Sequence, residues 1–362
     1  MKRILSLVLT VSVLFGLPCF AKAQSGMVLI EASTQRVLAS ENPDAKLPMA
    51  SLTKVMTALV VIEKTKNLQD LVKIDTRSVG IEGSSMYLKE GQVLSVEQLL
   101  YGLMLVSGND AAVALALHVG GNIENFVKMM NDTADKLGLK STHFLNPSGL
   151  YQEEHFTSAL DFANLTAYAL KNKIFSKIVK TKTYQVNNVT LVNHNRLLRE
   201  IKGCIGVKTG YTKVCGRCLV SAVEKEGITL ICVTLNYSDD WNVHKNLYEK
   251  NFPRCQQVLL LKEKEIYSKL KVAGGHNVGY YCTDIYGVVI DDHFEKEVEI
   301  YIPRFIYANK KSQEPVGRVE IIQDGNIVAS GKLLLDRDTR LHYQKKSFFS
   351  KMFHYILHIF GF

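Results

Sequence analysis

The sequence lacks the features that define several classes of protein. It has no internal repeat of the length that builds solenoids or propellers, and its 7 cysteines are too few to staple a disulfide scaffold of 362 residues. Hydrophobic residues make up 47% and charged residues 22% of the chain, which excludes a disordered, collagen-like or coiled-coil protein. The formal charge is +9, but neither a basic face nor a reader motif accompanies it, so we expect no nucleic-acid partner. The length fits two globular domains plus tails.

The first residues have the pattern of a secretory signal. Lys2 and Arg3 precede a short apolar run over residues 4–17, and Ala21-Lys22-Ala23 supplies a small-residue cleavage site. The run is shorter than the ~20 residues that a membrane-crossing helix needs. We therefore expect a signal peptide at residues 1–23 and export of the chain, with an uncleaved anchor or a buried strand as alternatives.

The last residues predict an amphipathic helix. At about 100° per residue, the apolar side chains of residues 347–362 share one broad face, whereas Lys351, His354 and His358 lie on the other. A short helix of this kind, rich in aromatic residues and with a basic edge, lies in a membrane interface. We expect a linker and a membrane-anchor helix at residues 339–362; the alternative is a helix packed on the protein's own core. The apolar face comprises Phe348, Met352, Tyr355, Ile356, Ile359 and Phe360.

Cysteine spacing gives a weak signal. Removal of the signal peptide takes away Cys19 and leaves an even number of cysteines, which permits disulfides in an exported protein. Cys215-Gly-Arg-Cys218 has the spacing of a redox or zinc pair, but no second pair stands at a zinc-ligand distance. We interpret it as a packing element or a disulfide, and not as a reactive pair.

The pattern of elements predicts an α+β protein. Residues 51–64 are apolar almost all round and contain no glycine or proline, which predicts a buried helix. Ser95-Val-Glu-Gln98 is a capping box that opens a helix running to Leu105. The other predicted elements are a strand pair at 26–39, helices at 110–118 and 157–172, and strands at 205–208, 217–223 and 228–235.

The order of these elements is strands, helices, strands. It predicts one antiparallel sheet with helices packed against it, in a domain over residues 24–255. Beyond Pro253 the helical periodicity fades, and Asp324-Gly325 is a hairpin signal between two apolar runs. We expect a small β-rich domain over residues 256–338.

Ser51-Leu-Thr-Lys54 places a serine and a lysine one helical turn apart, so the hydroxyl and the amine can touch. A serine hydroxyl becomes a strong nucleophile only when a neighbouring base takes its proton. Burial or a second cation would lower the pKa of the lysine and free its amine for that task. The spacing alone is weak, because Ser268-Lys-Leu-Lys271 repeats it in a strand-like segment.

Two further motifs strengthen the prediction of a catalytic site. Ser107-Gly108-Asn109 stands at a break between two apolar helices, and Lys208-Thr209-Gly210 ends a predicted strand. Lysine and threonine can bind an anion, while glycine permits close approach of a ligand backbone. Taken singly, the first is equally a helix cap and the second equally a β-turn. All three motifs in this order on compatible elements are hard to reconcile with coincidence.

These motifs are the signature of penicillin-binding proteins and serine β-lactamases. Their contexts resemble the low-molecular-mass D-alanyl-D-alanine carboxypeptidases of serine peptidase family S11, over about residues 26–250. The resemblance implies a transpeptidase-like antiparallel sheet flanked by helices, and the β-rich domain and terminal helix match the family's usual arrangement. The matching segments are Pro48-Met-Ala-Ser-Leu-Thr-Lys-Val-Met-Thr57, Leu105-Val-Ser-Gly-Asn-Asp-Ala-Ala112 and Val207-Lys-Thr-Gly-Tyr-Thr212.

The resemblance implies three catalytic residues. Ser51 attacks the carbonyl of the penultimate D-alanine and becomes the acyl-ester, and Lys54 accepts its proton. Ser107 relays a proton toward the leaving D-alanine. The backbone N–H groups of Ser51 and Tyr211 form the oxyanion hole.

The substrate-binding residues that it implies are Asn109, Lys208, Thr209, Gly210 and Tyr211. Asn109 holds the peptide amide and orients Lys54. Lys208 and Thr209 bind the terminal carboxylate, and Lys208 also helps to keep Lys54 neutral. One departure concerns Asp239-Asp240-Trp241, which stand where related enzymes often carry an arginine after the last strand.

The implied function is an exported serine D,D-carboxypeptidase that trims peptidoglycan stem pentapeptides at the outer face of the bacterial cytoplasmic membrane, either peripherally attached or secreted. β-Lactams are expected as covalent inhibitors. No metal or other cofactor is expected, and His143, His155 and His194 are interpreted as structural. A D,D-endopeptidase of the same chemistry and a catalytically silent wall-binding or β-lactam-sensing protein remain alternatives. A class A β-lactamase is disfavoured, because no Glu-x-x-Leu-Asn occurs between Asn109 and Lys208.

Overall fold

The computed structural model describes residues 24–273, 276–291, 296–323 and 325–339. The predicted signal peptide and the predicted amphipathic helix lie outside these residues. Within the described ranges, no helix is long and apolar enough to cross a membrane.

A five-stranded antiparallel sheet forms the centre of the first domain, in the order β2-β1-β9-β8-β7. The N-terminal strand pair and the three later strands therefore join into one sheet, as the sequence predicts. β7 is an edge strand, and it runs past the Lys-Thr-Gly motif to Thr212, so the prediction that this motif ends a strand is wrong. The strands are β1 (Gly26–Glu31), β2 (Val37–Glu41), β7 (Cys204–Thr212), β8 (Gly216–Lys225) and β9 (Ile228–Leu235).

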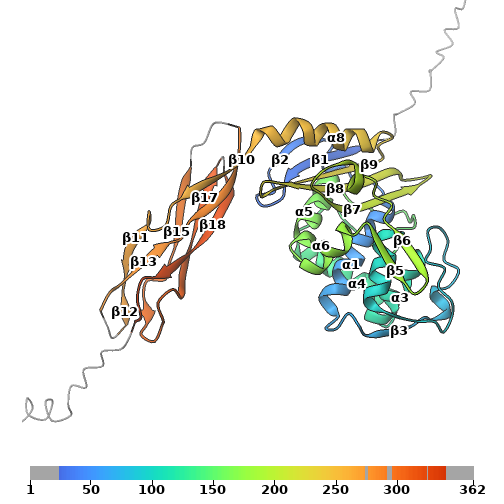
Figure 1. Cartoon of the computed structure of the whole chain (residues 1–362), viewed down its shortest axis with the longest axis horizontal. Coiled ribbons are helices and arrows are strands. Elements are labelled where there is room, and N and C mark those ends of the chain that lie inside the picture. The colour runs from blue at the N-terminus through green and yellow to red at the C-terminus, as the bar shows by residue number, and fades with distance from the viewer. Residues whose placement is uncertain (1–23, 274–275, 292–295, 324, 340–362) are drawn as a thin grey trace, which may run out of the picture.

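Helices cover both faces of this sheet (Figure 1). On one face, β1, β8 and β9 pack against the apolar side chains of a helical layer in a single large core. The opposite face packs against α8 (Asp240–Asn251), whose Tyr248 is buried there. The helical layer consists of α1 (Lys54–Lys64), α2 (Val96–Leu105), α3 (Asn109–Gly120), α4 (Ile123–Lys136), α5 (Ala159–Leu170) and α6 (Lys173–Lys180).

The helices begin where the sequence supplies caps. The Ser95 hydroxyl accepts from the Gln98 N–H, and the Gln98 side chain accepts from the Ser95 N–H, so the predicted capping box is present. The predicted helix at 51–64 is α1, which begins three residues later because a 3₁₀ turn, η1 (Ala50–Thr53), precedes it. The predictions did not include α4, α6 or α8, although Asn122 and Asn172 cap the first two.

Short elements connect the larger ones. Two antiparallel strand pairs and several short helical turns connect the helices and the strands of the central sheet. They are β3 (Leu71–Lys73) with β4 (Val93–Ser95), β5 (Thr183–Val186) with β6 (Val189–Val192), η2 (Thr76–Ser78), α7 (Leu197–Glu200) and η3 (Phe252–Arg254).

The remaining described strands form a β domain, as expected after Pro253. A five-stranded sheet has the order β11-β13-β18-β17-β15, and two two-stranded sheets pair β10 with β14 and β12 with β16. β17 and β18 form the predicted hairpin. The strands are β10 (Cys255–Leu261), β11 (Tyr267–Leu270), β12 (Val272–Ala273), β13 (Val278–Cys282), β14 (Ile285–Ile290), β15 (Glu297–Tyr301), β16 (Ile306–Tyr307), β17 (Pro315–Gln323) and β18 (Asn326–Leu335).

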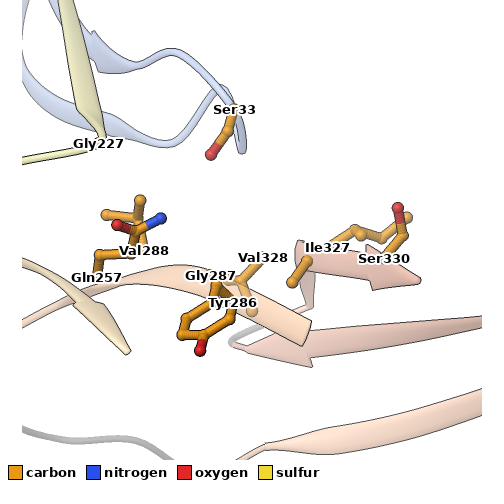
Figure 2. A pocket seen from close by; sticks show the side chains of 10 residues that line it. Ser33, Gly227, Gln257, Tyr286, Gly287, Val288, Ile327, Val328 and Ser330 are labelled. Carbon is orange, nitrogen blue, oxygen red and sulfur yellow. The ribbon is translucent and has the colours of Figure 1, made fainter. Parts of the chain in front are cut away.

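The two domains meet at the end of the β domain that carries β10 and β14. The Arg36 Nη1 donates to the Gln323 Oε1 at 2.9 Å across the junction. Beside it is a cavity of about 300 Å³, with Ser33 and Gly227 on one wall and Gln257, Tyr286 and Ile327 among the residues of the other. Figure 2 shows Ser33 and Gly227 on one side of this cavity and the other labelled residues on the opposite side.

All six cysteines of the described residues are buried free thiols. Cys215 lies in the turn between β7 and β8, Cys218 lies in β8, and both belong to the core, which fits packing and not a disulfide. Burial raises the pKa of the Cys218 thiol to about 12, so it is a poor nucleophile at neutral pH.

Candidate active site

The predicted nucleophile lies where η1 turns into α1. Ala50 adopts a φ of 47°, which an L-residue rarely takes, and Ser51 follows it, partly exposed at the start of the turn. Lys54 is the first residue of α1 and is fully buried. The Lys54 Nζ and the Ser51 Oγ lie 3.0 Å apart, within hydrogen-bond distance. The hydroxyl can therefore pass its proton directly to the amine, provided the amine is neutral.

The surroundings of Lys54 favour a neutral amine. Burial, followed by the positive charge of Lys208, holds the pKa of Lys54 well below its usual value, whereas Asp110 opposes the shift. An ammonium in this position would lose its hydration shell and face a second cation. The physical requirement for a lysine base is therefore met by the position itself.

Hydrogen bonds also orient the Lys54 amine. Its Nζ donates to the Asn109 Oδ1 at 2.6 Å and to the Ser148 carbonyl at 2.5 Å. A neutral amine has two N–H groups and one lone pair, and these two acceptors use both N–H groups. The lone pair is then left for the third neighbour, the Ser51 hydroxyl.

The predicted helix break lies beside this pair. α2 ends at Leu105 and α3 begins at Asn109, as expected, and Ser107 between them has a φ of 63°. The Ser107 Oγ is buried and has no hydrogen-bond partner among the described residues. It is free to bond to a group that enters the site. The Asn109 Nδ2 donates to the Glu82 carbonyl at 2.5 Å, so the amide that contacts Lys54 is itself held from the other side.

Asp110 fixes the segment that lies over this break. Its carboxylate is buried and accepts hydrogen bonds from the Ser85 hydroxyl at 2.6 Å and from the backbone N–H groups of Met86 and Leu88 at 2.9 and 3.0 Å. These partners lie more than twenty residues earlier in the chain. No role was predicted for Asp110 from the sequence. The available signal was an aspartate that directly follows the Ser-Gly-Asn motif, at the start of an apolar segment.

The third motif lies on the edge strand β7. Lys208 is buried, its Nζ donates to the Thr209 carbonyl at 2.8 Å, and burial lowers its pKa to about 7. Gly210 lies against the nucleophile, since a Cβ at this position would be 3.1 Å from the Ser51 backbone nitrogen. Tyr211 is 65% exposed. This part of β7 therefore lies directly beside η1, the turn that carries Ser51.

His155 supports the nucleophile from behind, as its structural interpretation requires. The Leu145 N–H donates to its Nδ1 at 3.0 Å, which assigns the ring proton to Nε2. The Nε2 lies 2.7 Å from the Thr53 Oγ1, which in turn donates to the Ala50 carbonyl at 2.9 Å. Burial lowers the pKa of His155 to about 4, so this tautomer persists through neutral pH.

The segment that departs from the family pattern has an arginine as its partner. Arg217 of β8 pairs in register with Tyr211 of β7. Its guanidinium donates twice to the buried Asp240 Oδ1, at 2.8 and 3.0 Å, and lies 5.6 Å from the centre of the Trp241 ring. No role was predicted for Arg217 from the sequence. The guanidinium is thus held at the start of α8, and its strand pairs with the end of β7 that carries Tyr211.

No group of three or more histidine, cysteine, aspartate or glutamate side chains in the described ranges is arranged to hold a metal ion. The groups gathered around Ser51 are its own hydroxyl, the buried lysines Lys54 and Lys208, the buried Ser107 hydroxyl and the edge strand β7.

Comparison with known proteins gives the same assignment as the motifs. The model of the D-alanyl-D-alanine carboxypeptidase family, peptidase family S11, matches residues 19–239. D-alanyl-D-alanine carboxypeptidase DacF of Bacillus subtilis is 32% identical over 331 residues, which cover 86% of this chain and 85% of that protein.

Two solved structures are similar over most of their length. Penicillin binding protein 5 of Haemophilus influenzae has a TM-score of 0.69 at 29% identity, covering 87% of this chain and 97% of its own. The PBP3 peptidoglycan synthesis regulatory factor of Streptococcus pneumoniae has a TM-score of 0.77 at 21% identity, covering 87% and 98%, which supports the fold alone. The chain therefore belongs to the D-alanyl-D-alanine carboxypeptidase family, peptidase family S11.

Proposed function

We propose that this protein is a serine-type D-alanyl-D-alanine carboxypeptidase that removes the terminal D-alanine from peptidoglycan stem pentapeptides. The observation that carries the proposal is the Lys54 amine, which is buried, 3.0 Å from the Ser51 hydroxyl and bonded through its N–H groups to two carbonyl oxygens. Membership of the family and the similarity to penicillin binding protein 5 support the same activity.

In the acylation step, Lys54 takes the Ser51 proton while Oγ attacks the carbonyl carbon of the penultimate D-alanine. The negative charge moves onto the carbonyl oxygen, which the backbone N–H groups of Ser51 and Tyr211 stabilise; such contacts contribute roughly 3–4 kcal/mol in known cases. The C–N bond then breaks, and a proton relayed through Ser107 reaches the leaving amine. D-Alanine departs and leaves an ester on Ser51. The Lys54 amine then takes a proton from a water molecule, which hydrolyses this ester and restores the enzyme.

The substrate is held along the edge of β7. Its terminal carboxylate binds Lys208 and Thr209, and Gly210 lets the substrate backbone approach the nucleophile. Asn109 contributes its remaining hydrogen-bonding capacity to the peptide amide. An ammonium at Lys208 is well matched to a carboxylate, because both charges lie in a partly dry crevice.

β-Lactams are proposed as covalent inhibitors of the same nucleophile. Their strained amide acylates Ser51, but the leaving amine stays attached to the acyl group, so it cannot diffuse away as D-alanine does. We expect a long-lived adduct and slow turnover. Fast multiple turnover of benzylpenicillin would contradict this part of the proposal.

Two alternatives share the fold. A D,D-endopeptidase would use the same residues on a cross-linked peptide and requires only room for a larger leaving group. A catalytically silent wall-binding or sensing protein would keep the crevice without turnover. The contact between Lys54 and Ser51 favours an active enzyme, because a silent protein has no need of a base at hydrogen-bond distance.

We further propose export through the signal at residues 1–23, a catalytic domain over 24–255, a β-rich domain over 256–338 and peripheral attachment to the outer face of the cytoplasmic membrane through residues 339–362. The amphipathic pattern of the last residues and the basic residues before them support attachment. Deletion of residues 345–362 is expected to release an active enzyme from membranes; unchanged membrane partition would contradict the anchor.

The experiment that tests the activity combines turnover with mass analysis. The protein is incubated with a stem pentapeptide to measure D-alanine release, and with benzylpenicillin before intact-mass analysis and peptide mapping. We expect an adduct on the peptide that contains Ser51, and loss of both adduct and release in Ser51→Ala. Ser268→Ala is the matched control, because it removes the serine of the other Ser-x-x-Lys sequence. D-Alanine release by Ser51→Ala would overturn the mechanism.

A further inference from the structure

Exposed aromatic side chains gather at one end of the β domain. Phe305 and Tyr307 flank the buried Ile306 and are 47% and 71% exposed. Their ring centroids are 5.6 Å apart and the rings stand edge to face. Ile302, in the loop that leads to them, is 36% exposed. We call Phe305 and Tyr307 the aromatic tip; neighbouring exposed apolar residues of this kind mark an interaction surface more often than single ones do.

Basic groups surround the aromatic tip. Arg304 and Lys311 are exposed on the same segment, and Lys271, also exposed, accepts a backbone hydrogen bond from Ile306 at 3.0 Å. The nearby Glu314 carboxylate is engaged by the Lys310 Nζ at 3.3 Å and by the Lys311 N–H at 2.9 Å. An acidic side chain lies close as well, since the Ser312 N–H donates to the Asp338 Oδ1 at 2.7 Å. Aromatic side chains among exposed basic groups are the composition of a surface that binds an anionic membrane interface.

The described chain ends beside this surface. The Thr339 N–H donates to the Lys310 carbonyl at 2.9 Å, and the Lys310 N–H donates to the Thr339 hydroxyl at 2.8 Å. Figure 1 shows β12, the partner of β16, at the end of the β domain that is remote from the catalytic domain. The last described residue, Thr339, thus contacts Lys310, which is three residues along the chain from the exposed Tyr307.

The sequence after Thr339 sets a limit on the distance to the bilayer. Residues 340–346 can span at most ~25 Å when fully extended, and residues 340–362 contain basic but no acidic side chains. If residues 347–362 lie in the membrane interface, Thr339 is held within that distance of anionic lipid, and the aromatic tip lies on the segment that contacts Thr339. The aromatic tip would then lie close to the bilayer, and its aromatic and basic composition suits that position.

We propose that the aromatic tip is a second membrane contact, in which Phe305 and Tyr307 enter the interface of an anionic bilayer beside the attached C-terminal segment. The proposal rests on the C-terminal attachment proposed above. One amphipathic segment gives weak and reversible binding, whereas two contacts on one body strengthen attachment and fix its orientation. The β domain then stands on the membrane by its tip and holds the active site away from it.

The experiment uses the full chain and a tryptophan as a depth probe. Tyr307→Trp is compared with Tyr286→Trp, because Tyr286 is an equally aromatic, 56% exposed residue of the same domain at the junction cavity. Both variants keep the single native tryptophan, Trp241, as a constant background. Vesicles of phosphatidylglycerol and brominated phosphatidylcholine quench only an indole that reaches the lipid. We expect quenching in Tyr307→Trp and none beyond the background in Tyr286→Trp.

The outcomes separate this proposal from the attachment on which it rests. If both variants sediment with vesicles and show equal quenching, the aromatic tip does not contact the membrane, whereas the C-terminal anchor is supported. Absence of sedimentation would overturn both. A blue shift of the Tyr307→Trp emission with protein concentration, in the absence of vesicles, would assign the surface to a second copy of the chain and overturn the membrane contact.

A pair of double variants tests the contribution to binding. Phe305→Ser with Tyr307→Ser is expected to weaken vesicle partition about tenfold, because two aromatic side chains lose their apolar surroundings. Tyr286→Ser with Ile327→Ser, which removes a matched exposed pair, is expected to leave partition unchanged. Release of D-alanine from a soluble pentapeptide should be the same in both. Equal partition of the two double variants would contradict the proposal.

Discussion

The sequence Ser-x-x-Lys occurs twice in this chain, and the structure treats the two copies differently. Ser51 and Lys54 lie at the start of α1, where residues three apart share a face, and their polar atoms are 3.0 Å apart with the lysine buried. Ser268 and Lys271 lie in and just after β11, where residues three apart point to opposite faces, and both are exposed. The spacing permits a nucleophile and base; the helix and the burial create them.

The largest difference between the two copies should appear when each lysine is removed. Lys54→Ala takes away the base and the partner of two carbonyl groups, so we expect the rate of acylation by benzylpenicillin to fall about 10³–10⁴-fold. Lys271→Ala should leave the rate unchanged. Stopped-flow or mass-resolved acylation kinetics measure both, with thermal melting to show that each variant is folded. Equal acylation rates in the two variants would show that Lys54 is not the base.

A smaller effect sharpens the contrast between buried and exposed lysines. Burial lowers the pKa of Lys208 to about 7, so this ammonium loses its proton as the pH rises through neutrality. For a peptide with a free C-terminal carboxylate, we therefore expect KM to increase as the pH is raised beyond about 7. Lys208→Met, similar in volume but uncharged, should raise KM about 10–100-fold at pH 7 and remove this pH dependence. A KM that stays flat to pH 9 in the unmodified protein would contradict the assignment.

The smallest predicted effect concerns stability. Asp110 is buried and accepts three hydrogen bonds from residues 85–88, so Asp110→Asn should lower the free energy of unfolding by about 2–3 kcal/mol. Asp132→Asn is the control, since Asp132 forms an exposed ion pair with Lys128 and should not change the melting temperature measurably. Identical denaturation curves for the two variants would show that the Asp110 network contributes nothing.

Much of the fold could be predicted because its signals are local. The apolar run of α1, the capping box at Ser95 and the short strands each depend on residues within one element. The helix α4 escaped prediction because its buried residues, Phe126, Met130 and Ala134, form a narrow stripe in an otherwise polar segment. The sparse stripe at four-residue spacing was its only signal.

The candidate site also contains some residues that local sequence patterns predict and others that they do not. The structure brings Ser51, Lys54 and Asn109 into contact and Gly210 against Ser51, and each of these residues belongs to one of the three sequence motifs. The Ser148 carbonyl that orients Lys54 is 94 residues away in sequence, and a backbone oxygen carries no residue-type signal. No local pattern could have identified it, because only the folded chain brings it to the amine.

The central claim is that Lys54 is a neutral amine at physiological pH. Its most direct test is the pH dependence of the first-order rate of Ser51 acylation, measured at saturating benzylpenicillin so that binding to Lys208 does not contribute. A pKa held well below the usual lysine value by burial and by Lys208 predicts a rate that reaches its plateau at a pH well below the ordinary lysine pKa. A rate that climbs about tenfold per pH unit from neutrality to the ordinary lysine pKa of ~10.4 would contradict the account.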